Sequence, residues 1–141
     1  MKYPTKSENT IHRISEEKSD KAYFTQTPRL IWALSRDPYD YILWNVVKDV
    51  AGEEGECYLS TRTLAKMGMM SVGKVVDCRD YLISAGLLMW EMKTPRGCTQ
   101  EVMHLKIVDI WQQSIEWSKE HKSISDRLQF KEELIAKIKD R

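Results

Sequence analysis

Three cysteines and three histidines have the side chains that most often carry out catalysis or bind metals. They are Cys57, Cys78 and Cys98, and His12, His104 and His121. The sequence contains no CxxC pair, no HExxH motif and no glycine-rich phosphate loop, the patterns typical of zinc sites, metalloproteases and nucleotide-binding proteins. The cysteines are odd in number and far apart, so no disulfide framework is indicated. We therefore expect a protein that is not an enzyme and that holds no metal or cofactor.

The distribution of charge indicates where a polyanion could bind. The whole chain has a net charge of +1, but residues 60 to 97 hold six Lys or Arg against three Asp or Glu. The preceding 59 residues hold eight Lys or Arg against ten Asp or Glu. A local basic surplus attracts phosphates, although an ordinary solvated face can have the same composition. Residues 60 to 97 are therefore the expected nucleic-acid segment.

The elements before this segment follow from helix caps and apolar periodicity. Residues 28 to 34 predict a short helix with Pro28 in its first turn. Asp37 and Pro38 then open an amphipathic helix, in which the Asp37 carboxylate accepts from free backbone amides, and Gly52 ends it. Its apolar residues recur with a helical period and are expected in the core. They are Ile42, Leu43, Val46, Val47 and Val50.

Two short helices joined by a tight turn are predicted next. Ser60 caps the first helix and Gly68 breaks it, and Ser71 caps the second, which Gly86 closes. The residues expected to face the core are Leu64, Ala65 and Met67 in the first helix and Val75, Cys78 and Leu82 in the second. Tyr81 is expected at a flank of this buried stripe. Two helices arranged in this way form a helix-turn-helix.

Two strands are predicted after the second helix, over residues 87 to 93 and 101 to 108. Alternation puts Leu88, Trp90 and Met92 on one face of the first strand and Met103, Leu105 and Ile107 on one face of the second. Pro95 and Gly97, as second and fourth turn residues, fit type I geometry. A helix-turn-helix followed by a hairpin is a winged helix. The predicted fold is therefore mainly α with a small β-hairpin wing and extra helices at both ends.

This pattern divides the chain into three parts. Residues 1 to 25 are polar and predict a flexible N-terminal arm. Residues 26 to 108 are expected to form the winged helix-turn-helix domain, and residues 109 to 141 are expected to form C-terminal helices. The first of these helices has one apolar stripe with Val108, Trp111 and Ile115, and Ile110 and Trp117 lie on a neighbouring face. The apolar stripe of the last helix contains Leu128, Ile135 and Ile138. The C-terminal helices are expected to pack on the domain or to form a dimer. The five tryptophans are interpreted as packing residues rather than a base-stacking platform.

The run CYLSTRTLAKMGMMSVGKVVDCRDYLISAGLL resembles a helix-turn-helix family found in phage, plasmid and bacterial replication-initiation and regulatory proteins. The resemblance rests on LA before the turn glycine, a serine that starts the second helix, a valine four residues later and a leucine ahead of AGLL. Residues 27 to 117 are similar to the N-terminal winged-helix domain of DnaD-like primosomal proteins. The second, helical DNA-binding domain of those proteins has no counterpart in this sequence, which leaves regulation or an accessory role in initiation.

The resemblance implies that the start of the second helix enters the major groove of DNA. Ser71, Gly73, Lys74 and Asp77 would then lie nearest to base edges and phosphates. Ser71 and the helix N-terminus can bind a phosphate oxygen, and Lys74 a phosphate or guanine. The Asp77 carboxylate would repel phosphates unless it accepts from cytosine or orients a neighbouring Lys or Arg. With Asp80, it also favours the alternative that this helix contacts protein.

Further DNA contacts are expected on both sides of this helix. Arg62 and Lys66 on the first helix would meet the DNA backbone, and Lys93 and Arg96 lie on the wing. The sequence thus predicts a homodimer that binds double-stranded DNA in replication initiation or transcriptional regulation. One alternative is a module that docks a replication or regulatory protein partner, and another is a regulator that responds to a small molecule. No apolar stretch predicts a membrane span or a signal peptide, so a cytoplasmic location is expected.

Overall fold

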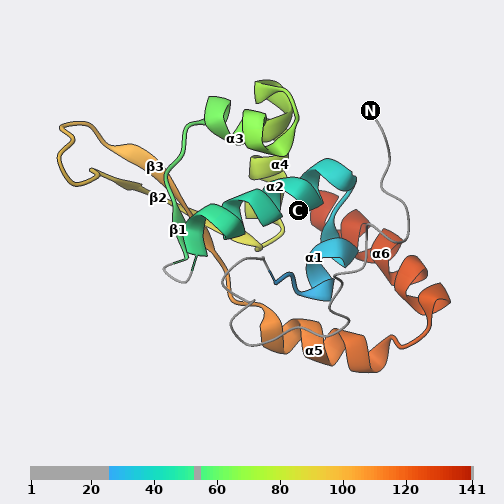
Figure 1. Ribbon diagram of the computed structural model, residues 1–141. Helices are drawn as coiled ribbons and strands as arrows, with labels where there is room; N and C mark the ends of the chain where they lie inside the picture. The colour runs from blue at the N-terminus through green and yellow to red at the C-terminus, as the bar shows by residue number, and fades with distance from the viewer. Residues whose placement is uncertain (1–25, 53–54, 141) are drawn as a thin grey trace, which may run out of the picture.

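The computed structural model describes residues 26–52 and 55–140, so the predicted N-terminal arm lies outside the described residues. This part of the chain is mostly helical with a small antiparallel sheet (Figure 1), as the sequence predicted. In chain order its elements are α1 (Arg29–Leu34), α2 (Pro38–Ala51), β1 (Glu56–Cys57), α3 (Thr61–Gly68), α4 (Val72–Ser84), β2 (Leu88–Lys93), β3 (Val102–Ile107), α5 (Trp111–Glu120) and α6 (Ile124–Lys139). The predicted order of two short helices and a hairpin is therefore present.

Polar side chains start the helices where the sequence predicted caps. The Asp37 carboxylate accepts from the backbone amides of Tyr39 and Asp40, at 2.9 and 3.1 Å, and so starts α2. The Ser60 hydroxyl accepts from the amide of Thr63 in α3 at 3.2 Å, and Ser71 caps α4 in the same way. Each cap satisfies an amide that has no partner within the helix.

The three strands pair in the order β1-β3-β2, all antiparallel. The predicted faces of the hairpin are confirmed, because three pairs of residues stand opposite one another and so share one face. These pairs are Leu88 with Ile107, Trp90 with Leu105, and Met92 with Met103. Leu88 and Leu105 are buried, whereas Trp90 is 52% exposed. The reason is that the hairpin extends beyond the helices, to the left in Figure 1.

The turn of the hairpin differs from the predicted geometry. The Cys98 amide donates to the Pro95 carbonyl at 3.0 Å, so Pro95 is the first turn residue and Gly97 the third. Gly97 has a φ of 85°. A positive φ at the third position is the mark of a type II turn, not of type I, and it explains why glycine is needed there.

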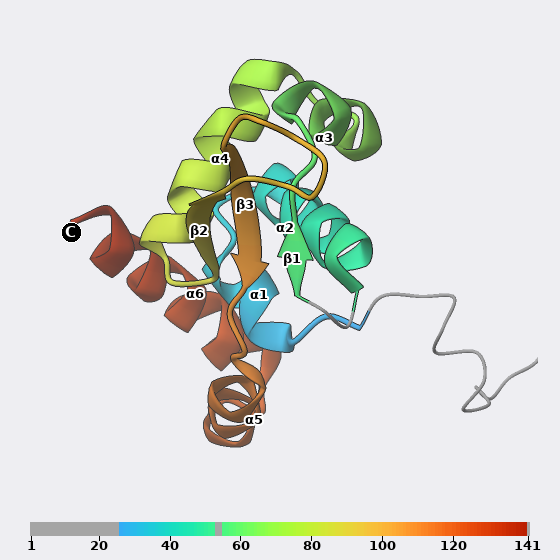
Figure 2. The same ribbon diagram turned by 90° about the vertical axis from the view of Figure 1, so that its left-hand side faces the viewer.

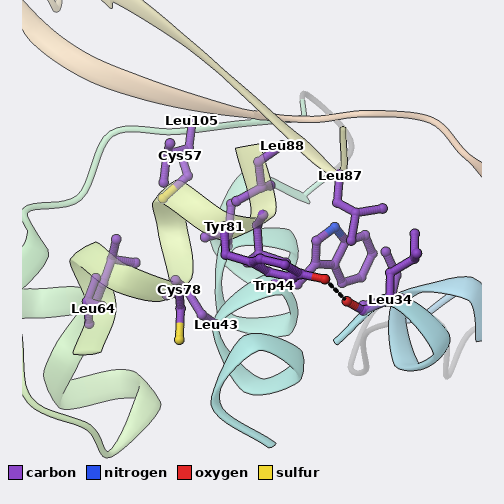
Figure 3. Close-up of a cluster of buried hydrophobic side chains, with 14 of the residues drawn as sticks. Leu34, Leu43, Trp44, Cys57, Leu64, Cys78, Tyr81, Leu87, Leu88 and Leu105 are labelled. Atoms are coloured by element: carbon purple, nitrogen blue, oxygen red, sulfur yellow. Dashed lines mark hydrogen bonds between the residues drawn. The ribbon is translucent and has the colours of Figure 1, made fainter. Parts of the chain in front are cut away.

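The core lies between α2, α4 and the base of the sheet (Figure 3). Val75, Cys78 and Leu82 are fully buried, which confirms the predicted inner stripe of α4. Tyr81, predicted at a flank, is also buried, and its hydroxyl donates to the Leu34 carbonyl at 2.6 Å. It is buried because the end of α1 covers that flank of α4. Such a contact between distant segments is not visible in the period of either helix.

The end of α3 corrects another prediction. Met67, expected in the core, is 42% exposed, whereas Gly68 is buried. A Cβ on Gly68 would lie 2.7 Å from the Met70 Cε atom and 3.7 Å from Cγ2 of Ile42 in α2. The left-handed residue that ends α3 is Met69, with a φ of 55°. Gly68 is thus a buried residue of α3, and the reversal of the chain falls on Met69.

Helices α5 and α6 both pack on α1 of the same chain. The Ser114 hydroxyl of α5 accepts from the Leu30 amide at the start of α1, at 3.1 Å. The Lys131 ammonium of α6 donates to the Trp32 and Ser35 carbonyls at the end of α1. Burial of this ammonium lowers the pKa of Lys131. The short helix α1 is thus held at both ends by groups from the C-terminal helices.

The buried face of α5 is not the first stripe that the sequence predicted. Its buried residues are Ser114 and Trp117, preceded by Ile110, while Trp111 and Ile115 are exposed. Of the five tryptophans, Trp44 and Trp117 are buried. The exposed tryptophans leave apolar surface available on two sides of the molecule.

The burial of the thiols leads to a first prediction. Cys57 and Cys78 are buried and Cys98 is exposed. Desolvation raises the pKa of Cys57, and raises that of Cys78 to about 12, so both remain unreactive thiols at neutral pH. We expect one thiol, Cys98, to react rapidly with DTNB in the native protein and all three after unfolding in guanidinium. A second rapidly reacting thiol in the native protein would contradict this burial.

Candidate nucleic-acid interface

The helices α3 and α4 meet at a short turn that lies on the surface, beyond the core (Figures 1 and 2). Met69, in left-handed conformation, ends α3, and the Ser71 hydroxyl starts α4 by accepting from the Lys74 amide at 3.1 Å. The turn is therefore held by caps on both sides. It presents the N-terminal end of α4, with its free amides, to solvent.

An open hollow of about 660 Å³ lies at this turn. Arg62 and Lys66 of α3 line it together with Ser71 and Val72 at the start of α4. The side chains of Arg62 and Lys66 are exposed, and neither has an acidic partner among the described residues. Two free cations and a helix N-terminus thus converge on one site, and both features favour a bound anion.

Lys74 is more constrained than the sequence predicted. Its ammonium lies 2.7 Å from the Asp37 carboxylate and 3.6 Å from that of Asp77, and 5.3 Å from the ring centroid of Tyr39. The hydrogen bond to Asp37 raises the pKa of Lys74. Burial by itself would raise the pKa of Asp37, but bonds from Lys74 and the α2 amides outweigh it and lower that pKa. The charge of Lys74 is therefore largely compensated within the protein.

Asp77 binds cations, one of the two roles considered for it. The Arg36 guanidinium donates to Asp77 at 2.9 Å, and through Nε and Nη2 to Asp40 at 2.9 and 3.0 Å. Asp40 is completely buried. Its hydrogen bonds raise the pKa of Arg36, and Arg36 in turn lowers the pKa of Asp77. This network joins the exposed face of α4 to the start of α2.

Arg36 is the residue of this region that sequence reasoning missed. Its only local signal was its position four residues before Asp40, which is the spacing of an ion pair on a helix. Arg36 precedes α2 rather than lying within it, so that signal was weak. Its bond to Asp77, 41 positions away, has no signal in the sequence.

The position of Asp77 gives a pH-dependent prediction. Because the folded state lowers the pKa of Asp77, its ion pairs add stability above the unfolded pKa of about 4. This stability is lost as the pH falls through the folded-state value. We therefore expect Asp77→Asn to lower Tm at neutral pH, by a loss of up to about 1 kcal/mol since the pair is at the surface. The difference in Tm from the wild type should vanish in strong acid, and a difference independent of pH would contradict the prediction.

Lys93 belongs to a balanced charge cluster at the sheet rather than to a free basic surface. Its ammonium lies 2.6 Å from the Glu56 carboxylate, and Lys106 lies 2.5 Å from Glu91. Bonds from Lys93 and Lys106 lower the pKa of Glu56. Two acids and two lysines compensate one another here, so Lys93 is a weaker candidate for phosphate contact than its position on the wing predicted.

Arg96 and Gly73 remain open to a ligand. Arg96 lies in the hairpin turn, is exposed, and forms no ion pair with a described residue. Nothing lies within 4 Å of where a Cβ on Gly73 would stand. The space at Gly73 is therefore free for a ligand and is not needed for packing within the protein. On the same helix, Asp80 pairs with Arg79 at 3.1 Å.

Oxygen and sulfur atoms of Asp37, Asp40 and Cys78 lie within 4.8 Å of one another, a set that could in principle bind a metal ion. The carboxylates are bound by Lys74, Arg36 and the amides that start α2. Cys78 is fully buried, and desolvation raises the pKa of its thiol. The chemistry of this group is that of a structural ion-pair network.

In the residues that the structure describes, no helix combines the length and the apolar character needed to cross a membrane. No protein-family model, curated protein or solved structure matches this chain significantly.

Proposed function

We propose that this protein is a winged helix that binds double-stranded DNA through α3, the start of α4 and the tip of the β2–β3 hairpin. The observation that carries the proposal is the convergence of Arg62, Lys66 and the N-terminal end of α4 at Ser71 on one open hollow. Phosphate contacts at such a site supply affinity for any sequence, and base contacts from α4 would supply specificity.

The order of elements supports the same proposal. A helix, a short strand, two helices joined by a turn and a two-stranded hairpin follow one another in the chain. In a winged helix this order puts the second helix of the pair in the major groove and the hairpin beside it. The biological setting that we propose is replication initiation or transcriptional regulation in the cytoplasm. A homodimer would put two α4 helices in successive major grooves.

A second candidate function is the docking of a protein partner on the same helices. It is favoured by exposed apolar side chains at the α3–α4 turn, where Met69 is 81% exposed and Val72 is also exposed. It is also favoured by the acids that compensate Lys74. An apolar surface next to compensated charges is more typical of a protein interface than of a DNA interface.

Fluorescence anisotropy of a labelled random-sequence duplex, titrated with the protein at several salt concentrations, tests the first candidate. We expect binding whose affinity falls steeply as salt increases, because each phosphate contact releases counterions. No binding at low salt would contradict DNA binding and favour the docking function.

The wing has its own prediction. Arg96→Ala should weaken binding to all duplexes by a similar factor and reduce the slope of log K against log salt by about one. Lys93→Ala should change the slope less, since Lys93 is already paired with Glu56. An unchanged slope for Arg96→Ala would show that the hairpin tip does not contact the DNA.

A further inference from the structure

A second surface with no assigned role lies along α1, α5 and the start of α6. One groove of about 390 Å³ is lined by residues that include Trp32, Tyr41 and Leu128. A neighbouring hollow of about 440 Å³ is lined by residues that include Trp111 and Ile115 of α5. Thr27 and Arg29 line both, so the two hollows adjoin, and we name the surface that they form together the α1–α5 track.

Apolar side chains make up much of this track. Ile124 is 75% exposed and Leu128 is 51% exposed, on the first turns of α6. Trp32, Tyr41, Trp111 and Ile115 are each more than a third exposed. Large apolar side chains gathered in one place mark a site where a partner removes them from water.

The charge of the track has a single sign. Its cationic residues are Arg29, Lys119, Lys122 and Arg127, and none of its lining residues is acidic. Arg29 forms no ion pair with a described residue. The Arg127 guanidinium donates through Nε to the His121 carbonyl at 2.7 Å and lies 5.7 Å from the Trp117 ring centroid, which leaves its other N–H groups free for a ligand. A complementary ligand must therefore carry anionic groups as well as apolar groups.

We propose that the α1–α5 track binds an acidic peptide segment of a partner protein, in which carboxylates stand beside large aliphatic or aromatic side chains. Arg29 and Arg127 bind the carboxylates, and the apolar side chains enter the grooves beside Trp32 and Trp111. Arginine is suited to this role because its planar group binds a carboxylate through two parallel hydrogen bonds.

Exposed aliphatic residues favour a peptide over single-stranded nucleic acid. Nucleic-acid bases stack on aromatic faces, but Ile115, Ile124 and Leu128 offer no such face. An apolar peptide side chain is stabilised by burial against aliphatic and aromatic residues alike.

Both ribbon views put α5 at the opposite end of the molecule from the α3–α4 turn (Figures 1 and 2). The peptide and a DNA duplex can therefore bind at the same time.

Selection of short random peptides displayed on phage, with the full chain as target, tests the proposal. We expect enriched peptides that are acidic and rich in Leu, Ile, Phe or Trp. Synthetic copies, labelled for anisotropy, should bind Arg29→Glu and Leu128→Asp at least about tenfold more weakly than the wild type. Arg29 is exposed at the first turn of α1, where a negative charge suits the helix dipole, so Arg29→Glu should fold.

Arg96→Glu, which makes the same change of charge at the hairpin tip, is the matched control and should leave peptide affinity unchanged. Thermal melts confirm that all variants fold. The proposal is overturned if no peptide is enriched, if the enriched peptides are not acidic, or if Arg29→Glu binds them as the wild type does. If the wild type binds labelled oligothymidine and Arg29→Glu does not, the ligand of the track is single-stranded nucleic acid and not a peptide. Because the duplex assay uses another surface, failure here leaves the proposed DNA binding untouched.

Discussion

The double variant Arg62→Glu, Lys66→Glu is expected to bind duplex DNA at least about 100-fold more weakly than the wild type at physiological salt. Both side chains line the hollow at the start of α4 and are free of acidic partners among the described residues. Reversal of their charge would remove the two proposed phosphate contacts and put two carboxylates where phosphates would lie. Lys74, at the start of α4, cannot replace them, because it is bound by Asp37 and Asp77.

Anisotropy titrations of the same labelled duplex measure this loss. Lys119→Glu with Lys122→Glu is the matched control, because it makes the same change in net charge at the end of α5 and just after it, at the other end of the molecule (Figure 1). If affinity depends only on the net charge of the protein, both double variants will lose affinity for the duplex to the same extent. The proposed interface at α3 and α4 is then wrong. A large loss confined to the Arg62 and Lys66 variant supports it.

Val75→Asp is expected to abolish the cooperative unfolding transition. Val75 is completely buried in the stripe of α4 that faces α2. A carboxylate there would be buried without a cation, or would be protonated at a cost, and it would displace packed methyl groups. Such a change costs more than about 4 kcal/mol, against a total stability of about 5–15 kcal/mol for a domain.

Thermal melts followed by circular dichroism measure this effect. Val72→Asp is the control, since Val72 lies on the same helix but is 44% exposed in the first turn. An acidic residue near a helix N-terminus is favourable, so this variant should keep a sharp transition. A normal transition in Val75→Asp would mean that another face of α4 is turned to the core.

The ion pairs of α4 decide how it could read DNA. Lys74 can contact a phosphate or guanine only if it leaves Asp37 or Asp77, and that exchange reduces the gain from the new contact. Arg62 and Lys66 pay no such cost. We therefore expect α3 and the hairpin tip to supply most of the affinity, with a smaller contribution from Lys74.

The sequence by itself determined the features that depend on neighbours a few residues apart. Caps at Asp37, Ser60 and Ser71, the buried stripe of α4, and the pairing faces of the hairpin were all predicted and are all found. These features could be predicted because hydrogen bonds to the first helical amides and the periods of helix and strand are local. The choice of Met67 for the core of α3 failed, because the buried face of α3 runs through Leu64, Ala65 and Gly68 and leaves Met67 at its edge.

Only the tertiary structure decided which charges are free. Arg62, Lys66, Lys74 and Lys93 were equivalent in the sequence as basic residues near a turn or wing, yet Lys74 and Lys93 are paired with acids 37 positions away in the chain. The α1–α5 track likewise exists because α1 lies between helices that begin more than 75 residues after it ends. The local period of a helix tells which of its faces is apolar. It does not tell which distant segment covers that face or neutralises its charges, and that depends on how the helices pack.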